Sequence, residues 1–308
     1  MTGCRICTKQ FEPFISFGKM PLANGFLTPT QFGDEYFFEL AVGVCPTCSM
    51  VQLVAQPARE RMFHENYAFF SSTSARMMQH FKEFANSVMT GYLTDADSLV
   101  VEIGSNDGIL LQHFAQSGIR HVGIEPSTNV AQVAVEKGIR TVSRFFDETL
   151  ARNLVEEYGK ADVILGANVM CHIPYLHSVA AGVEILLKPG GILIFEDPYL
   201  GDIIEKTAYD QIYDEHVFYF SLTSICYLFA QHGMEVVDVT PQQVHGGSMR
   251  YVVAHRGSRS VSPTVAAQRV KEETLGIGIP ETYSELRRKI EKSRTNLMTL
   301  LQDLRRLG

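Results

Sequence analysis

Two Cys-x-x-Cys pairs near the amino terminus constrain the fold of this chain more than any other feature. Cys4 and Cys7 form the first pair, and Cys45 and Cys48 form the second. Zinc prefers four tetrahedral ligands, and a two-residue spacer lets both sulfurs of a pair reach one ion. The sequence therefore predicts a zinc-binding domain over residues 1–62, with a structural ion because four sulfurs leave no open coordination position. A redox pair is disfavoured because a matching second pair is present, and four unrelated core thiols are the remaining alternative.

The next part of the chain, residues 63–257, alternates between apolar runs and helical patterns. The first five apolar runs lie at 99–103, 121–125, 139–142, 162–167 and 191–196. Alternation of this kind predicts a parallel sheet with helices on both faces. One helix at 221–232 then precedes two runs, 235–239 and 249–254, whose short connection suggests an antiparallel hairpin. We therefore predict an α/β fold with a seven-stranded Rossmann-like sheet, because a terminal hairpin is typical of methyltransferases and absent from plain NAD-binding sheets.

A glycine-rich turn, EIGSNDG at 102–108, follows the first of these runs. Gly104 permits a tight turn, and Gly108 lets the next helix pack closely. The exposed amino terminus of that helix favours a polar or anionic cofactor group. Asn106 stands where a dinucleotide fingerprint has its middle glycine, which counts against NAD. Glu125 ends the second run and is well placed to accept hydrogen bonds from ribose hydroxyls.

Two further features favour S-adenosylmethionine as the cofactor. LKPGG at 187–191 resembles the turn before the fifth strand of S-adenosylmethionine-dependent methyltransferases, and Asn168 follows the fourth strand. Together they favour this cofactor over a dinucleotide. The predicted cofactor-binding residues are Glu102, Gly104, Asn106, Asp107, Gly108, Glu125 and Asn168.

Several longer segments carry a family resemblance. They are YAFFSS at 67–72, EIGSNDG at 102–108, ANVMCHIP at 167–174, FEDPYLGD at 195–202, QIYDEH at 211–216 and VHGG at 244–247. Together with the cysteine pairs, the chain resembles zinc-containing, S-adenosylmethionine-dependent C-methyltransferases over essentially its whole length. Within that family the resemblance is to the 3-C-methyltransferases of dTDP-4-keto-deoxysugars, such as the D-tetronitrose branch enzymes. It implies a dTDP-linked 4-keto-deoxysugar as substrate and a role in deoxysugar and antibiotic biosynthesis.

One departure from the family is expected at the carboxyl end. Members of the family normally continue into a second α/β domain that helps to hold the sugar nucleotide. We expect this chain to lack that domain, so that residues 258–308 are a helical linker to a missing carboxyl-terminal domain. A Ser/Pro-containing stretch is followed by a charged helix from about Glu281. An apolar stripe along this helix needs a cover and fits the same expectation; it is formed by Leu286, Ile290, Leu297, Leu301 and Leu304.

Methylation of a carbon beside a ketone requires a base and a hydrogen-bond donor. The base removes the proton from the carbon, the donor stabilises the enolate oxygen, and the carbon attacks the sulfonium methyl group. A base with a pKa near neutrality is favoured, which points to histidine. His216 is the predicted base, and the resemblance assigns its neighbours to the same region. The predicted catalytic residues are His216, Glu215, Tyr213, His172 and Tyr67.

Two residues are predicted to contact the substrate. Tyr67 maps onto an active-site position of the family, although an aromatic residue that packs a domain junction is an equally good explanation. His245 precedes two glycines in a turn where the backbone can approach a ligand closely, and turn geometry alone would also explain this motif.

Composition excludes other classes of function. The 308 residues carry a formal net charge of −7 without a long basic run, so a nucleic-acid partner is not expected. No long apolar run or secretory signal appears, so we expect no membrane partner and a cytoplasmic location. The alternatives are a zinc-ribbon nucleic-acid methyltransferase and a catalytically silent protein that binds S-adenosylmethionine and zinc. The sequence leaves the oligomeric state open.

Overall fold

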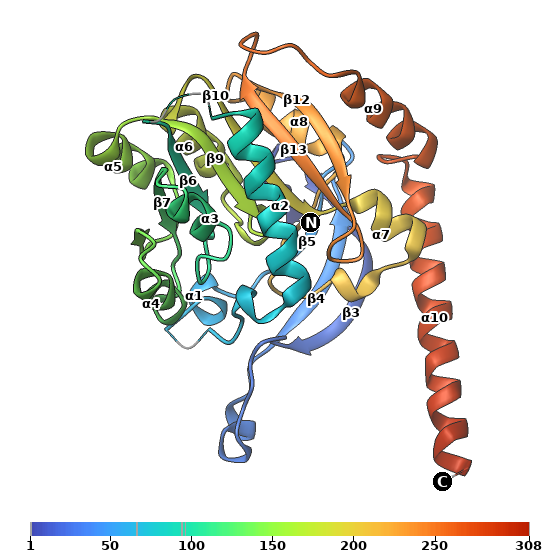
Figure 1. Cartoon of the computed structure of the whole chain (residues 1–308). Helices are drawn as coiled ribbons and strands as arrows, with labels where there is room; N and C mark the ends of the chain where they lie inside the picture. Colours follow the sequence, from blue (N-terminus) through green and yellow to red (C-terminus); the bar gives the residue numbers. More distant parts are fainter. Residues whose placement is uncertain (1, 66, 94, 96, 308) are drawn as a thin grey trace.

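The computed structural model describes residues 2–65, 67–93, 95 and 97–307. Its centre is a seven-stranded sheet (Figure 1). The strands are β6 (Leu99–Ile103), β7 (Arg120–Ile124), β8 (Thr141–Val142), β9 (Ala161–Ala167), β10 (Leu187–Pro198), β12 (Met234–Gln242) and β13 (Ser248–His255). Their order is β12-β13-β10-β9-β6-β7-β8, and β13 is antiparallel to both neighbours whereas the pairs among the first five strands are parallel. The predicted Rossmann-like methyltransferase sheet with its terminal hairpin is confirmed.

Helices bury both faces of this sheet, which is why the parallel strands are nearly continuous apolar runs. Every residue of β6 is buried, with Val100 facing one side and Val101 the other. The face that contains Val100 packs against α2 (Ala75–Gly91), α3 (Leu111–Gln116) and α4 (Thr128–Glu136). The opposite face packs against α5 (Glu148–Tyr158), α6 (Leu176–Leu186) and α8 (Leu222–Ala230).

The amino-terminal module contains a second sheet, with strand order β11-β5-β4-β3. Its strands are β3 (Pro13–Pro21), β4 (Phe37–Val44), β5 (Val51–Leu53) and β11 (Phe218–Tyr219), and a small hairpin of β1 (Thr2–Gly3) and β2 (Gln10–Phe11) precedes them. The strand β11 was not predicted, and it follows directly after the predicted catalytic residue His216. The methyltransferase part of the chain thus supplies one strand of the zinc module's sheet.

Three helices were not predicted: α1 (Arg59–Met62), α7 (Leu200–Lys206) and α9 (Pro263–Leu275). The first two have too few turns to show a clear 3.6-residue period. The third lies within the predicted linker; it begins after Ser262, whose side chain caps Thr264 N, and ends at Gly276 in the left-handed region with φ +76°. Short 3₁₀ turns cover Pro29–Asp34, Ser71–Thr73, Met170–His172 and Tyr209–Gln211.

The carboxyl-terminal helices pack onto the body of the protein. Glu272 of α9 is 1% exposed, and its carboxylate accepts hydrogen bonds from the backbone nitrogens of Leu222 and Thr223 at 2.6 and 2.9 Å. A buried carboxylate at the amino terminus of α8 stabilises that helix and attaches α9 to it. Within the described residues, no helix is long and apolar enough to cross a membrane.

The last helix is α10 (Pro280–Leu307). We expected its apolar stripe to be uncovered, and this is wrong for the first half of the helix. Its first half packs beside β3 and α7, so Leu286 and Ile290 are only 2% and 3% exposed. Its second half projects from the body (Figure 1), where Leu297, Leu301 and Leu304 are 50 to 53% exposed. The stripe is therefore covered over its first turns by the chain itself.

Candidate active site

The four predicted zinc ligands lie together in the amino-terminal module. The Sγ atoms of Cys4 and Cys48 are 3.6 Å apart, those of Cys7 and Cys45 are 3.2 Å apart, and all four lie within 4.8 Å of one another. Zinc–sulfur bonds of about 2.3 Å in a tetrahedron separate the sulfurs by about 3.8 Å. The Gln52 side-chain amide donates to Cys4 Sγ at 3.0 Å, which stabilises a thiolate. The donor set and its spacing fit one structural zinc ion.

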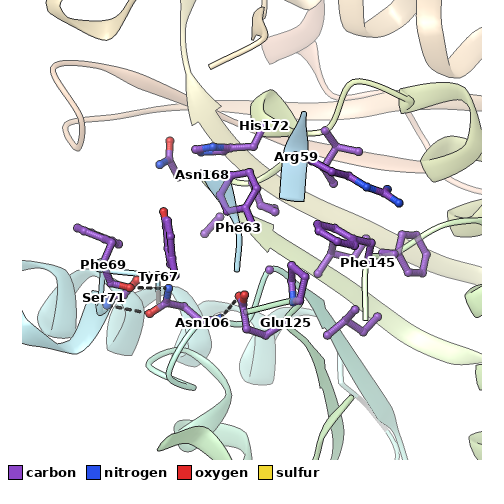
Figure 2. A pocket seen from close by; sticks show the side chains of 18 of the residues that line it. Arg59, Phe63, Tyr67, Phe69, Ser71, Asn106, Glu125, Phe145, Asn168 and His172 are labelled. Atoms are coloured by element: carbon purple, nitrogen blue, oxygen red, sulfur yellow. Dashed lines mark hydrogen bonds between the residues drawn. The ribbon is translucent and has the colours of Figure 1, made fainter. Parts of the chain in front are cut away.

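A pocket opens at the carboxyl ends of β6, β7 and β9, the edge where open α/β sheets bind ligands. Its walls include four predicted cofactor residues and three predicted catalytic or substrate residues: Gly104, Asn106, Glu125, Asn168, Tyr67, His172 and His245. In the view of Figure 2, Glu125 and His172 lie on opposite sides of the pocket, with Phe63 and Tyr67 between them. The predicted cofactor end and the predicted catalytic end therefore share one cavity.

Glu125 and Asn168 supply the polar groups of the cofactor end. Glu125 follows β7 directly, and its carboxylate oxygens accept hydrogen bonds from the backbone nitrogens of Ser127 and Asn106 at 2.8 and 3.1 Å. Each oxygen keeps a second lone pair for a ligand hydroxyl. Asn168 Oδ1 is buried without a hydrogen-bond partner among the described residues. Because buried polar atoms are normally paired, this oxygen fits a donor from a bound S-adenosylmethionine.

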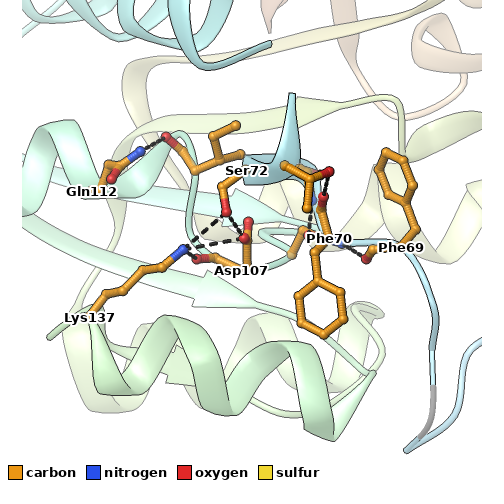
Figure 3. Close-up of polar contacts among 10 residues, drawn as sticks. Phe69, Phe70, Ser72, Asp107, Gln112 and Lys137 are labelled. Atoms are coloured by element: carbon orange, nitrogen blue, oxygen red, sulfur yellow. Dashed lines mark hydrogen bonds and ion pairs between the residues drawn. The ribbon is translucent and has the colours of Figure 1, made fainter. Parts of the chain in front are cut away.

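The side chains of Asn106 and Asp107 fasten a neighbouring segment to the cofactor turn. Asn106 Oδ1 accepts a hydrogen bond from the backbone nitrogen of Ser71 at 2.9 Å. The Asp107 carboxylate accepts from the Ser72 hydroxyl and lies 3.3 Å from Lys137 Nζ (Figure 3). The segment held in this way carries the predicted active-site tyrosine into the pocket wall.

The other predicted cofactor residues support the glycine-rich turn at 102–108 without lining the pocket, except Gly104, which does both. Glu102, Asp107 and Gly108 are not among the described residues that line the pocket. Burial raises the pKa of the Glu102 carboxyl well above its ordinary value, so we expect this group to hold a proton. Gly104 and Gly108 have φ values of +69° and +80°, and a Cβ at Gly108 would approach Ile139 Cδ1 to 2.2 Å. Glycine is required at both positions by backbone conformation and by packing, since a Cβ at Gly104 would approach Val169 Cγ2 to 2.4 Å.

At the catalytic end, His216 has a defined tautomer. Its Nδ1 lies 2.9 Å from the Gln211 carbonyl oxygen, which can only accept, so Nδ1 carries the proton. Its Nε2 is then the acceptor for the Tyr213 hydroxyl at 3.0 Å. Burial lowers the pKa of His216 well below its ordinary value. The ring is therefore a neutral imidazole, and Nε2 can act as a general base once the Tyr213 hydroxyl no longer occupies it.

Glu215 joins His216 to the pocket wall. Its Oε2 accepts a hydrogen bond from the Tyr67 hydroxyl at 3.2 Å and lies 3.7 Å from His172 Nδ1. Burial raises the pKa of Glu215 to about 7 and lowers the pKa of His172 to about 4. Neither ring nitrogen of His172 has a hydrogen-bond partner among the described residues. His216 itself is 2% exposed and lies behind His172, with ring centroids 5.0 Å apart.

His245, the second predicted substrate contact, lies in the connection between β12 and β13 and lines the same pocket. It adopts a left-handed conformation with φ +51°, followed by Gly246 and Gly247 at φ +78° and +133°. A Cβ at Gly247 would approach the Asp202 carboxyl carbon to 2.4 Å, so the glycine allows this turn to pack closely on α7. The structure thus brings all five predicted catalytic residues and His245 to one end of the sheet.

Sequence reasoning missed several residues at this site. The Arg59 guanidinium lies over the rings of Phe145 and Tyr175, at 4.1 and 4.9 Å from their centroids, and all three line the pocket. Asn24, from the amino-terminal module, donates a hydrogen bond to Glu215 Oε1 at 2.5 Å. Neither set carries a sequence motif, because the contacts join segments that are far apart in the chain. A cation over two aromatic rings is visible only in three dimensions.

Family models match the chain in three successive stretches. They describe a zinc binding domain at residues 4–63, a methyltransferase domain at 75–239 and a C-methyltransferase C-terminal domain at 243–308. The third match overturns our expectation that the chain lacks the family's carboxyl-terminal domain. The sequence pattern indicated only a linker and a charged helix at 258–308, whereas these residues include α9 and the packed half of α10, which contribute to the core.

Individual proteins of known sequence or structure are also similar to this chain. The C-methyltransferase NovU of Streptomyces niveus is 35% identical over 305 residues, which cover 97% of this chain and 72% of the relative. A ubiquinone biosynthesis O-methyltransferase of Escherichia coli is 28% identical over 153 residues, covering 45% of this chain and 63% of the relative. The structure of magnesium protoporphyrin IX methyltransferase from Synechocystis PCC 6803 aligns with a TM-score of 0.45 and 15% identity, covering 63% of this chain and 91% of that chain.

Three observations agree on the cofactors: the four cysteines fit a zinc ion, the sheet is of the methyltransferase type, and the family models describe a zinc-binding and a methyltransferase domain. S-adenosylmethionine and zinc are therefore the cofactors, as predicted. The chain belongs to the S-adenosylmethionine-dependent C-methyltransferases that carry an amino-terminal zinc-binding domain.

Proposed function

We propose that this enzyme methylates carbon 3 of a dTDP-linked 4-keto-deoxysugar through an enolate intermediate, in deoxysugar biosynthesis. The observation that carries the proposal is the cluster of buried His216, Glu215 and His172 with partly buried Tyr213, at one end of the pocket that Glu125 also lines. A carbon beside a ketone becomes a nucleophile only after it loses a proton. A fixed neutral imidazole near protonated phenols supplies the base and the donors for that step.

His216 is the proposed base. Its Nε2 takes the proton from carbon 3 after the Tyr213 hydroxyl turns away from it, because Nδ1 already holds a proton bonded to the Gln211 carbonyl. The electrons of the broken C–H bond form the carbon–carbon double bond of the enolate, and the ketone oxygen gains the negative charge. The Glu215 carboxylate, in the residue next to His216, would stabilise the imidazolium that results.

Tyr67 and Tyr213 are the proposed donors to the enolate oxygen. Burial raises the pKa of both phenols, so each keeps its single proton. Tyr67 gives this proton to Glu215 Oε2 and Tyr213 gives it to His216 Nε2, so each hydroxyl would turn to the enolate oxygen when substrate binds. Bound S-adenosylmethionine supplies an electrophilic methyl group at this end of the pocket. Glu125 would hold its ribose, and Asn168 would accept a hydrogen bond from the same ligand. Tyr67 and His245 would contact the sugar.

An isotope experiment tests this proposal. The enzyme is incubated in D₂O with labelled S-adenosylmethionine and a dTDP-4-keto-deoxysugar, and deuterium and label at carbon 3 are measured by NMR. We expect methyl transfer to carbon 3 in the wild type and loss of both transfer and exchange in His216→Gln. A matched control is His121→Gln, since His121 lies at the opposite end of β7 from the pocket. Transfer to oxygen or nitrogen, or full activity of His216→Gln, contradicts the proposal.

A further inference from the structure

The zinc module reaches into the catalytic cluster through the loop between β3 and β4. Two consecutive residues of this loop bind two consecutive carboxylates of the catalytic segment. The backbone nitrogen of Ala23 donates to Asp214 Oδ1 at 3.0 Å, and the side-chain amide of Asn24 donates to Glu215 Oε1 at 2.5 Å. These contacts join parts of the chain that are 191 residues apart.

The Asn24 contact occupies one specific oxygen of Glu215. The other oxygen, Oε2, accepts from the Tyr67 hydroxyl and lies 3.7 Å from His172 Nδ1. The Glu215 side chain is 3% exposed, so water has little access to replace a lost partner. An amide N–H can donate but cannot accept, so a proton on Glu215 belongs on Oε2, the oxygen that faces His172.

The same catalytic segment is also held by the zinc module on its other side. Directly after His216, β11 pairs with β5, where Phe218 lies opposite Gln52. Gln52 in turn donates its side-chain hydrogen bond to the zinc ligand Cys4. The loop that carries the proposed base therefore lies between two attachments to the amino-terminal module. Side chains on the zinc module are thus positioned to control the geometry of this loop.

We propose that Asn24 is a positioning residue of the active site, which orients the Glu215 carboxylate and directs its proton to the oxygen facing His172. This inference rests on the proposed catalytic role of the cluster. Loss of the amide should raise the pKa of Glu215, because a hydrogen bond to the carboxylate favours its ionised form. The titratable groups that face or flank Glu215 are Tyr67, Cys171, His172, Tyr213, Asp214 and His216.

Carbon-13 NMR of the zinc-loaded full chain, labelled at glutamate carboxyls, measures the Glu215 titration without substrate. A Glu215→Gln variant assigns the signal. We expect Asn24→Ala to raise the pKa of Glu215 by about one unit from about 7. Asn24→Asp, which places a second carboxylate there, should raise it further. The matched control is Gln31→Ala in the same loop, whose side chain contacts Thr28; it should leave the titration unchanged.

Kinetics then separate positioning from general damage to the fold. For Asn24→Ala we expect kcat to fall about tenfold, with its pH profile displaced upward. Zinc content and the Kd of S-adenosylmethionine should stay at wild-type values. An unchanged Glu215 titration in both Asn24 variants overturns the inference, whatever the substrate. A shifted titration in a wild-type background that methylates no 4-keto sugar nucleotide supports the positioning role and overturns the proposed function instead.

Discussion

Two clusters in the described part of the chain bring residues of metal-binding types within 4.8 Å of one another, yet their chemistry differs. The first consists of Cys4, Cys7, Cys45 and Cys48, and the second of Cys171, His172 and His216. In the first cluster the Sγ atoms of Cys4 and Cys48 are 3.6 Å apart and those of Cys7 and Cys45 are 3.2 Å apart, which suits a shared ion. In the second, both ring nitrogens of His216 are engaged by the Gln211 carbonyl and the Tyr213 hydroxyl. Hydrogen-bond partners, rather than proximity, distinguish an acid–base cluster from a metal site.

The clusters also differ in how the chain assembles them. Each half of the zinc cluster is a local turn with two ligands. The proposed catalytic cluster draws Asn24, Tyr67 and His172 from three separate segments and adds the loop at 213–216. Local spacing identifies the first kind of site, whereas the second exists only when the sheet and the zinc module are in place. The predictions that follow test this contrast.

The largest effect is expected from breaking the zinc cluster. Cys45→Ser removes one of four ligands, and structural zinc contributes roughly 10–16 kcal/mol to folding in zinc-finger peptides. We expect loss of bound zinc and a fall of several kcal/mol in the free energy of unfolding, measured by metal analysis and denaturant titration. The control is Cys171→Ser, which should keep one zinc ion per chain. Zinc loss in the control instead would make the second cluster a metal site.

A smaller effect is expected from the phenol that contacts the base. Tyr213→Phe removes the donor to His216 Nε2 and a proposed donor to the enolate, and we expect kcat to fall about 100-fold. Zinc content and S-adenosylmethionine affinity should not change. Tyr209→Phe is a matched control in the same region, because its hydroxyl contacts Ser293 of α10. Equal losses in both variants would show that the effect comes from loop packing.

The cofactor end should respond in binding rather than in proton transfer. We expect Glu125→Gln to weaken S-adenosylmethionine binding about tenfold in calorimetry, because one charged acceptor for the ribose is lost. Hydrogen exchange at the substrate carbon should be retained at saturating cofactor. Glu136→Gln, at the exposed end of α4, is the control. An unchanged Kd for Glu125→Gln would remove this residue from the cofactor site.

The smallest expected effect is a bend in the pH–rate profile. The pKa of Glu215 is raised to about 7, so its carboxyl is mostly neutral below that pH and ionised above it. Because the ionised form would stabilise the imidazolium that we propose for His216, kcat should rise several-fold as the pH increases through 7. Glu215→Gln should be slower and lack this bend. The same bend in both proteins would assign the titration to another group.

Much of the fold could be predicted from the sequence. The order of apolar runs and helical patterns identified the parallel sheet and its hairpin, since periodicity reports burial directly. The strand β11 and the helix α7 were missed because two and seven residues are too few to show a period. The helix α9 was missed because its buried residues include Gln268 and Glu272, which are polar. The sequence pattern predicts a glutamate at such a position to be on the surface, although Glu272 is buried and caps another helix.

The sequence by itself determined the zinc ligands and the glycine turn, because both depend on residues a few positions apart. Only the tertiary structure decided that Asn106 and Asp107 fasten the Tyr67 segment, and that Asn24 contacts Glu215. It also decided the protonation of the histidines, because burial, and after it a neighbouring histidine, lowers the pKa values of His172 and His216. Such properties arise from groups that meet only after folding, where low solvent access magnifies each hydrogen bond and charge.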